Sequence, residues 1–529
     1  EMVIRDWSSD VCSSDLENKG YVILVSKKGG DNPGMVPKGA YLTIEEGGCK
    51  FILRVQGSTQ NVPYAPSPLV VDMNLPPMEQ DRKCQNIVEA FRVLTVSSRT
   101  DGLVDYIKPQ SVARLSTQDE INQAMGTENG GPQVFPATMY SGQIQKLKDA
   151  SGKLIKVCLP NDMFFHQSMI CGRTGLGKTV AIKYLAQHFI ESMHGAVLAI
   201  NVKEEDLLTM DKPSETESAE VTEEWQAIGE NSGRGITNFT VHYPACARPH
   251  YSSRVTSART KPITLLLNRL DPDSLIGLLR GVTDAAAQSL PGIFMKWKDQ
   301  KKQEDITFQN FYTYICNSKD RYFDTLNARG EPGNITLHPS THESLKRIMD
   351  SARDFFENPG AEFLEVEEIL AECQVSVIDI VAAGDKGKQF GAVLLQDILK
   401  RVIQYKAHEE RPLPILIIID EVHEFYGGEE TKKALGILDN ICRTGRSKKN
   451  AIIFSSQNPS DIPSGLENVV NTKIFFKSDR SKIAGIQIKD EEMESLPKGY
   501  AAAQIHGLHQ LKLLKFPLAL CGVEGKGGK

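Results

Sequence analysis

The segment Ser168–Val180 constrains the possible fold more than any other part of the sequence. A short apolar run, Ser168–Cys171, leads directly into GRTGLGKT, and an amphipathic helical pattern follows. This matches the phosphate-loop pattern G-x-x-x-x-G-K-[ST] in the strand, loop and helix context that the pattern requires. The sequence therefore predicts a nucleotide site on an α/β domain. The alternative, a chance glycine-rich turn, is disfavoured by the strand and helix patterns on either side.

The loop residues have distinct expected roles. Its glycines allow successive backbone N–H groups to surround a phosphate at a helix N-terminus, whose partial positive charge favours anions. We expect Lys178 to neutralise the β- and γ-phosphate oxygens and Thr179 to hold Mg²⁺. The candidate ATP-binding residues are Gly172, Arg173, Thr174, Gly175, Leu176, Gly177, Lys178, Thr179 and Val180.

A second motif, PILIIIDEVHEF, narrows the chemistry. Its apolar run Ile415–Ile419 is typical of a strand buried on both faces of a parallel sheet, and it ends in Asp420 and Glu421. Ligands bind at the carboxyl ends of such strands. We expect Asp420 to help hold Mg²⁺ and Glu421 to activate the attacking water. The alternative is that Glu421 only caps the next helix.

A third motif, RTGRSKKNAIIFSSQNPSDIP, adds a glutamine and two arginines. NAIIFSS predicts another buried strand, and Gln457 at its end would lie beside the γ-phosphate. Arg443 and Arg446 precede this strand and lie too far along the chain to join the same phosphate loop. In a ring of identical subunits they would face the neighbour's nucleotide and stabilise the transferring phosphoryl group. Alternatively, they form an exposed basic turn or pair with DEVHE.

The three motifs together resemble the HerA branch of the HerA/FtsK superfamily, and the resemblance extends from about Glu17 to about Pro517. It implies a RecA-like P-loop core with a predominantly parallel sheet, an N-terminal β-barrel and an inserted helical bundle. It also implies a ring, usually a homo-hexamer, that uses ATP and Mg²⁺ to translocate double-stranded DNA, often with a separate nuclease or other effector subunit.

The resemblance also implies specific roles for individual residues. Lys178, Glu421 and Gln457 would be catalytic, Thr179 and Asp420 would bind the metal, and Arg446, ahead of Arg443, would be the arginine finger. The sequence departs from the family after the strand AVLAI, where Asn201 replaces an often acidic residue. Lys203, Glu204 and Glu205 are the candidates for its polar role.

Changes in the pattern of apolar and polar residues along the sequence predict the domain organisation. Residues 1–16 contain DWSSDVCSSDL, which resembles a translated sequencing adapter, so we set them aside as an artefact. Short alternating runs such as KFILRVQ, which places Phe51, Leu53 and Val55 on one face, predict a β-barrel. The predicted domains are the barrel at 17–125, the first half of the core at 126–246, an inserted helical bundle at 247–360, the second half at 361–517 and a tail at 518–529.

Composition excludes several classes of protein. The formal net charge of −6, from 61 basic and 67 acidic residues, argues against a protein that coats nucleic acid with its whole surface. No segment has the apolar length of a membrane span, so we expect no membrane contact. The ten cysteines form no CxxC pair or Cys/His cluster, which indicates neither a zinc site nor a disulfide framework and favours the cytoplasm.

Three functions remain open from the sequence. The favoured one is an ATP-driven helicase or translocase on double-stranded DNA, in DNA end processing or antiviral defence. The second is a conjugation-type coupling ATPase, and the third is an ATP-gated scaffold that assembles and regulates an associated effector. No nuclease motif is visible in this sequence, so any cutting would belong to another polypeptide.

Overall fold

The computed structural model divides the chain into two compact units, which we describe separately. The N-terminal unit comprises residues 1–129, 133–159 and 508–515, and the core unit comprises residues 130–132, 160–507 and 516–529. The structure describes residues 2–4, 21–26, 36–61, 85–96, 107–108, 111–127, 130–140, 143–149, 151–279, 287–327, 330–426, 432–458, 461, 469–478, 488, 490–508 and 511–524.

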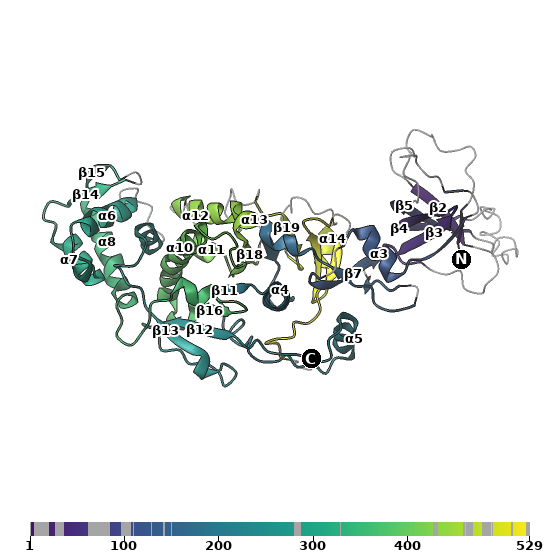
Figure 1. Ribbon diagram of the computed structural model, residues 1–529, viewed down its shortest axis with the longest axis horizontal. Helices are drawn as coiled ribbons and strands as arrows, with labels where there is room; N and C mark the ends of the chain where they lie inside the picture. Colours follow the sequence, from purple (N-terminus) through teal and green to yellow (C-terminus); the bar gives the residue numbers. More distant parts are fainter. Residues whose placement is uncertain are drawn as a thin grey trace, which may run out of the picture. The chain divides into compact units, whose positions relative to one another are not determined.

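The N-terminal unit contains a closed antiparallel barrel (Figure 1). Its strands follow the order β1-β2-β5-β4-β3-β6. The strands are β1 (Met2–Ile4), β2 (Tyr21–Ser26), β3 (Tyr41–Glu46), β4 (Cys49–Asn61), β5 (Gln85–Val96) and β6 (Val112–Leu115). The ladder between β4 and β5 shifts register at two places, which bends long strands as a small barrel requires. The predicted barrel is therefore present.

The barrel core follows the alternation seen in the sequence. Phe51, Leu53 and Val55 are each at most 2% exposed and belong to one apolar cluster. Met2–Ile4 pairs with both β2 and β6 and so completes the closed barrel, although residues 1–16 were expected to be an artefact. The adapter-like segment from Asp6 to Leu16 lies outside the described residues.

A buried carboxylate joins helix α3 (Gln118–Met125) to the barrel. Glu120 accepts hydrogen bonds from Thr43, Lys50 and Arg114, and it completes a capping box with Thr117. Burial alone would raise the pKa of Glu120, but the hydrogen bonds from Arg114 and its other partners outweigh burial and hold that pKa well below its usual range. The remaining elements of this unit are β7 (Gln133–Tyr140), β8 (Gln143–Lys146), β9 (Val157–Cys158) and β21 (Leu513–Lys515).

The core unit is built on a sheet of order β13-β12-β16-β11-β17-β18-β10-β19-β20. Every neighbouring pair in this order is parallel except β19 with β20. The strands are β10 (Ser168–Cys171), β11 (Ala196–Asn201), β12 (Phe239–Pro244), β13 (Thr260–Ile263), β16 (Val375–Asp379), β17 (Ile415–Ile419), β18 (Asn450–Ser456), β19 (Thr472–Phe475) and β20 (Tyr500–Gln504). The predicted α/β class with a predominantly parallel sheet is confirmed.

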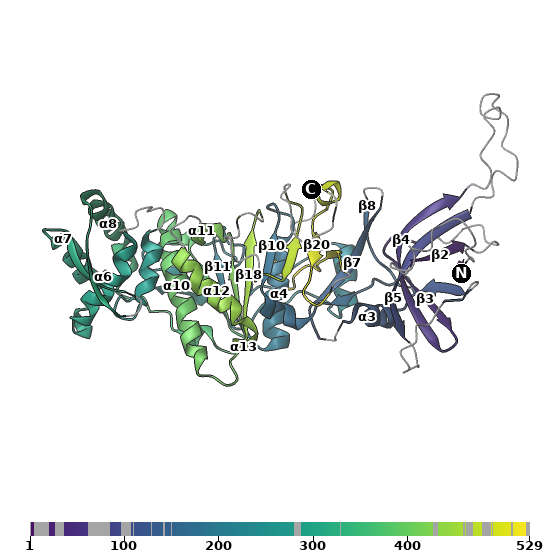
Figure 2. The same ribbon diagram turned by 90° about the horizontal axis from the view of Figure 1, so that it is seen from above.

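The central strands are buried on both faces. Every residue of β10, β11, β16, β17 and β18 is buried, as expected for parallel strands covered by helices on both sides. Helices α10 and α12 pack on each other beside the sheet (Figures 1 and 2). The helices of the core are α4 (Lys178–Met193), α5 (Ala219–Ile228), α9 (Val366–Ile369), α10 (Asp385–Ala407), α11 (His423–Tyr426), α12 (Lys432–Arg443), α13 (Gly445–Lys448) and α14 (Asp490–Glu494).

The helical insertion is shorter than predicted and is not purely helical. Residues 260–263 form strand β13 of the core sheet, so the insertion begins after that strand and not at residue 247. In both views its helices gather with a two-stranded hairpin (Figures 1 and 2). Its elements are the 3₁₀ helix η4 (Pro272–Leu279), α6 (Leu290–Asp299), α7 (Phe308–Asn317), β14 (Tyr322–Leu326), β15 (Pro332–Thr336) and α8 (Pro339–Ala352).

The C-terminal segment packs on its own core as far as Glu524. The backbone of Leu520 accepts from Ser214, and that of Gly522 accepts from the buried Lys183 ammonium at 2.7 Å. Trp225 donates its indole N–H to the carbonyl of Leu518 at 2.8 Å. Most of the predicted tail at 518–529 is therefore part of the core unit.

None of the described helices combines the length and the apolar character that a membrane crossing requires. The eight cysteines among the described residues are free thiols, namely Cys49, Cys158, Cys171, Cys246, Cys316, Cys373, Cys442 and Cys521.

A buried lysine gives the core a pH-dependent stability. Lys406 is fully buried, and its ammonium donates to the Asn450 side chain at 2.8 Å and to the Lys449 carbonyl at 3.3 Å. Burial lowers the pKa of Lys406 from 10.5 to about 7. Between these two values the unfolded chain keeps a proton that the folded chain releases. This group therefore makes the free energy of unfolding rise with pH across that window.

We expect Lys406→Met to remove this contribution. From about pH 7 to about pH 9 the free energy of unfolding of the original chain should rise by roughly 2–3 kcal/mol more than that of the variant, because only the original chain releases a proton on folding there. Denaturant unfolding at the two pH values measures the difference. Lys319→Met, at an exposed lysine, is the matched control. Equal pH dependence in Lys406→Met and the original chain would show that Lys406 does not titrate in this range.

Candidate nucleotide site

The predicted functional residues follow the carboxyl ends of neighbouring parallel strands. Cys171 at the end of β10 pairs with Ser456 at the end of β18, and Ile419 at the end of β17 pairs with Phe454. The phosphate loop, the acidic pair and Gln457 each begin where one of these strands stops. Because parallel strands end at the same edge of a sheet, motifs more than 200 residues apart meet there.

The phosphate loop is tightly packed at its first residue and exposed at the residues that follow. Gly172 has φ +152°, and a Cβ at this position would lie 2.6 Å from the Cβ of Phe476, so only glycine fits without displacement. Gly177, with φ +113°, precedes the first turn of α4. Arg173, Thr174 and Gly175 are exposed. The loop is therefore anchored at its base and accessible where an anion would bind.

Lys178 is held at this edge by two partners. Its ammonium donates to the carbonyl of Ser456 at 2.9 Å and lies 3.8 Å from the carboxylate of Glu421. Burial lowers the pKa of Lys178, and the positive charge of Lys203 lowers it further. A bound polyphosphate would offset both effects by supplying negative charge.

The first metal candidate, Thr179, contacts a carboxylate that the sequence did not single out. Its hydroxyl donates to Asp206 at 3.3 Å, and in the described part of the chain no hydrogen bond joins it to Asp420. Asp420 instead accepts from the hydroxyl of Ser455 at 2.7 Å. Burial raises the pKa of Asp420, although the Ser455 hydrogen bond partly offsets this. Asp206 was not among the predicted site residues.

Glu421 is at the centre of the site. It is 4% exposed and has a left-handed backbone with φ +45°. One oxygen, Oε1, accepts from the ammonium of Lys203 and from the Gln457 amide at 3.4 Å. These partners come from the segments after β11 and β18. Among the described residues, the hydrogen bonds of this side chain go to the site and not to the backbone of α11.

The other oxygen of Glu421 points to a second group of residues. Oε2 is buried without a hydrogen-bond partner among the described residues, and His423 Nδ1 lies 3.6 Å from it. The same ring nitrogen lies 3.8 Å from Asp461, which accepts from the hydroxyl of Ser456 and from the backbone N–H of Asn458 at 3.1 Å. A buried acceptor without a donor is what a water or a hydrated metal ion would satisfy.

The Asn201 position, where the sequence departs from the related family, has a clear structural role. Asn201 donates to the carbonyl of Glu204 at 2.7 Å and to Asp379 at 3.1 Å. Asp379 ends β16, is 2% exposed and also accepts from the Tyr251 hydroxyl at 2.9 Å. Of the three candidates Lys203, Glu204 and Glu205, Lys203 is the one whose side chain reaches Glu421.

The two arginines lie away from this cluster. Both precede β18, whereas Gln457 follows it, so the length of a seven-residue strand, about 20 Å, separates them from the site. Arg443 pairs with Asp439 at 2.6 Å on the same helix. Arg446 is exposed and forms no hydrogen bond or ion pair with the described residues. Neither pairs with DEVHE within one subunit.

A cleft of about 670 Å³ lies beside α4 and is lined in part by Lys183, Asp206, Tyr251, Arg254 and Asp379. Asp206 connects it to Thr179 in the phosphate loop. The cleft has charged groups of both signs, and its volume is in the range of small-molecule sites.

The polar groups of this site fit a nucleoside triphosphate with Mg²⁺. An exposed glycine-rich loop at a helix N-terminus, a buried lysine and several carboxylates supply the groups that phosphates and a hard cation require. Sequence reasoning missed four residues of this edge: Asp206, Asp379, His423 and Asp461. Asp379 had a detectable signal, because it ends the apolar run VSVID just as Asp420 ends ILIII.

The family described as Helicase HerA-like C-terminal matches residues 145–474, which is more than half of the chain. No curated protein matches the sequence.

Similar solved structures include VirB4 of Thermoanaerobacter pseudethanolicus, with 14% identity, coverage of 74% of this chain and 97% of that one, and a TM-score of 0.43. The plasmid coupling protein TrwB with the GTP analogue GDPNP has 10% identity, coverage of 78% and 95%, and a TM-score of 0.46. TrwB with ADP and Mg²⁺ has 10% identity, coverage of 78% and 94%, and a TM-score of 0.45.

The contact between Lys203 and Glu421 is open to a direct test. Lys203→Met leaves a buried carboxylate with less compensation, so we expect the free energy of unfolding to fall by about 1–3 kcal/mol. In the background Glu421→Gln the same change should have a much smaller effect, because the charge that Lys203 neutralises is gone. Denaturant unfolding of the four proteins, without nucleotide, measures this coupling.

Lys261→Met, at an exposed lysine of β13, provides the matched control for that cycle. It should show no coupling to Glu421→Gln. Additive effects of Lys203→Met and Glu421→Gln would mean that the two side chains do not interact.

Proposed function

Because the chain belongs to the HerA-like helicase C-terminal family, we propose that it is an ATPase that assembles into a ring and moves along double-stranded DNA. The expected ring is a homo-hexamer, the cofactors are ATP and Mg²⁺, and a separate nuclease or other effector acts with it in DNA end processing or antiviral defence. It works as a soluble cytoplasmic assembly.

The observation that carries this proposal is the separation of the arginines from the rest of the site. Lys178, Glu421 and Gln457 lie at the carboxyl edge of the core sheet, while Arg446 precedes β18 at the opposite edge. An exposed guanidinium that has no partner among the described residues is available to a second subunit. Such a group stabilises a transferring phosphoryl group and makes hydrolysis depend on assembly.

Each residue of the site has a defined task in this scheme. Lys178 and the backbone N–H groups of the phosphate loop hold the β- and γ-phosphates. Thr179 and Asp420 are the residues proposed to hold Mg²⁺, with Asp206 close to Thr179, and the ion would supply positive charge against the phosphates when bound. The cleft beside α4 has room for the sugar and base.

Glu421 is the proposed general base. Its unpartnered oxygen Oε2 can accept a proton from the attacking water, while Lys203 and Gln457 hold the other oxygen. Gln457 follows β18, the strand that Arg446 precedes. A change in the Gln457 contact on hydrolysis can therefore alter the position of residues 443–446, the arginine segment, which would face the neighbouring subunit.

Two substitutions separate binding from hydrolysis. Lys178→Ala should abolish ATP binding, because it removes the buried charge that faces the phosphates. Glu421→Gln should keep binding but lower turnover at least about a hundredfold, because the amide is not a base. Nucleotide affinity, DNA-stimulated hydrolysis and displacement of a protein roadblock from duplex DNA are the measurements.

The original chain should show hydrolysis stimulated by duplex DNA and ATP-dependent displacement of the roadblock. ATP-dependent ring assembly without movement along DNA would instead support the scaffold function. Equal loss of nucleotide binding in both variants would contradict the roles given to Lys178 and Glu421.

The arginine assignment predicts complementation between subunits. Arg446→Ala should retain ATP affinity but lower hydrolysis in the assembled ring by about 10³-fold, the typical contribution of an arginine finger. Mixing Arg446→Ala subunits with Glu421→Gln subunits should restore part of the turnover, because some interfaces then contain both intact groups. Steady-state ATPase rates across mixing ratios are the readout.

Arg443→Ala is the matched control, since Arg443 already pairs with Asp439 on its own helix. It should retain most of the activity. If the mixtures never exceed the sum of the separate variants, Arg446 does not act across a subunit interface.

A further inference from the structure

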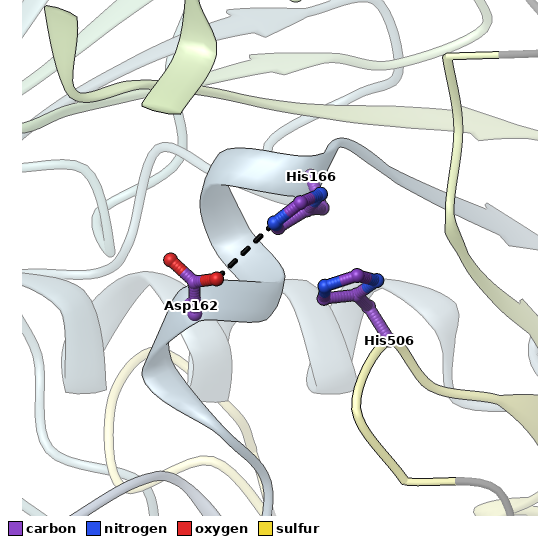
Figure 3. Close-up of side chains that lie close together, drawn as sticks. All are labelled: Asp162, His166 and His506. Carbon is purple, nitrogen blue, oxygen red and sulfur yellow. Dashed lines mark hydrogen bonds and ion pairs between the residues drawn. The ribbon is translucent and has the colours of Figure 1, made fainter. Parts of the chain in front are cut away.

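Two histidines and an aspartate from distant parts of the sequence meet in the core unit. Asp162 and His166 belong to the 3₁₀ helix η2 (Asn161–His166), which precedes β10. His506 lies in the turn after β20. Figure 3 shows the two imidazole rings facing each other, with Asp162 beside His166. This cluster lies at the amino edge of the parallel sheet, because η2 leads into β10 and the nucleotide site follows that strand.

The geometry of the cluster is compact. His166 Nε2 lies 3.1 Å from the Asp162 carboxylate, and the ring centroids of His166 and His506 are 3.6 Å apart with an interplanar angle of 22°. One ligand atom from each of the three residues lies within 4.8 Å of the others. Ligand atoms around a tetrahedral Zn²⁺ are roughly 3.4 Å apart. To bind one ion, the two imidazoles would turn out of their stacked arrangement so that a nitrogen lone pair of each points at the ion.

Backbone contacts hold both histidines in place. The carbonyl of His166 accepts from the N–H of Asn471 at 3.0 Å, and the N–H of His506 donates to the Thr472 hydroxyl at 3.2 Å. Both contacts are made at the start of β19. The side chain of His166 is only 14% exposed. These contacts fix the backbone positions from which the two imidazoles reach the cluster.

We propose that Asp162, His166 and His506 bind a transition-metal ion of the Zn²⁺ class. Two imidazoles and one carboxylate form a ligand set that Zn²⁺ and Co²⁺ prefer, whereas Mg²⁺ prefers oxygen ligands alone. A water molecule would complete a tetrahedral shell. The ion would be distinct from the Mg²⁺ of the nucleotide site, which lies at the opposite edge of the sheet.

Two other groups of potential ligands fit an ion less well. In the group His194, Glu372 and Cys373, the first two side chains are about two-thirds exposed, and the thiol donates to the carbonyl of Ile190. Burial also raises the pKa of Cys373, which opposes formation of the thiolate that binds a metal. The third group, centred on Glu421, belongs to the nucleotide site and already contains Lys203.

A bound ion would stabilise the segment that enters the phosphate-loop strand. It would link η2 to the turn after β20, across about 340 residues of sequence. Gln167, next to His166, donates to the carbonyl of Cys442 and accepts from the N–H of Ile452. The ion would therefore also stabilise these two contacts of Gln167, which join the end of α12 to β18.

The test uses the full chain without an affinity tag, treated with a chelator, desalted and titrated with Zn²⁺ in the absence of nucleotide. Metal content per chain and the midpoint of thermal unfolding are measured. We expect one Zn²⁺ per chain and a higher midpoint, and Co²⁺ should give the visible absorption of a tetrahedral site. His506→Ala and Asp162→Asn should each weaken Zn²⁺ binding at least tenfold.

His194→Ala is the matched control and should bind Zn²⁺ as the original chain does. Lys178→Ala should also bind Zn²⁺ normally, so the metal site and the nucleotide site can fail independently. Unchanged ATP affinity in His506→Ala would show that this variant is folded. Zn²⁺ binding that survives both His506→Ala and Asp162→Asn, or that is lost only in His194→Ala, would overturn the proposal.

Discussion

The carboxylate of Glu421 is buried at the carboxyl edge of the core sheet, where an isolated negative charge would be strongly unfavourable. The surrounding residues compensate it. Lys203 and Gln457 donate to one oxygen, and Lys178 lies 3.8 Å from it. These donors come from the segment after β11, from the end of β18 and from the phosphate loop. Compensation of this one buried charge therefore depends on β10, β11 and β18 ending close to one another.

The same arrangement explains why the site suits ATP hydrolysis. Lys178 is a buried cation with its pKa lowered by burial, and a triphosphate would supply the missing negative charge. Glu421 keeps one oxygen without a hydrogen-bond partner among the described residues. These are the properties on which the roles proposed for Lys178 and Glu421, in phosphate binding and water activation, depend.

Strand β18 connects two functional edges of the core sheet. Gln457 follows it at the nucleotide site, while Arg446 and the contacts of Gln167 and Lys406 lie where it begins. The strand is fully buried and hydrogen-bonded to β10 on one side and to β17 on the other, so it joins the two edges within the core of the sheet. The proposed metal ion would lie near the starting end and would stiffen it.

The two edges also differ in the cations they favour. The nucleotide edge is rich in carboxylates and hydroxyls, which suit Mg²⁺, whereas Asp162, His166 and His506 supply mainly imidazole nitrogen. The lack of CxxC motifs predicts no zinc site built from closely spaced cysteines, and the proposed site is of another kind because it uses imidazoles from distant segments. Ligands some 340 residues apart leave no local pattern.

The sequence alone determined the class of fold and the positions of three candidate site residues. GRTGLGKT, ILIIIDE and NAIIFSSQ each combine a strand pattern with functional groups at its end, so local order was enough to predict a parallel sheet with Lys178, Glu421 and Gln457 at one edge. The alternation in KFILRVQ likewise predicted the barrel core. These predictions succeeded because both side-chain direction and strand ends are encoded within a few residues.

Only the tertiary structure decided the remaining contacts. It paired Thr179 with Asp206, placed Lys203 on Glu421, assigned residues 260–263 to the sheet and brought His166 to His506. Each of these depends on which strands are neighbours and on how side chains fill the space between them. Strand order and packing are properties of the whole chain, and for that reason no local pattern of residues specifies them.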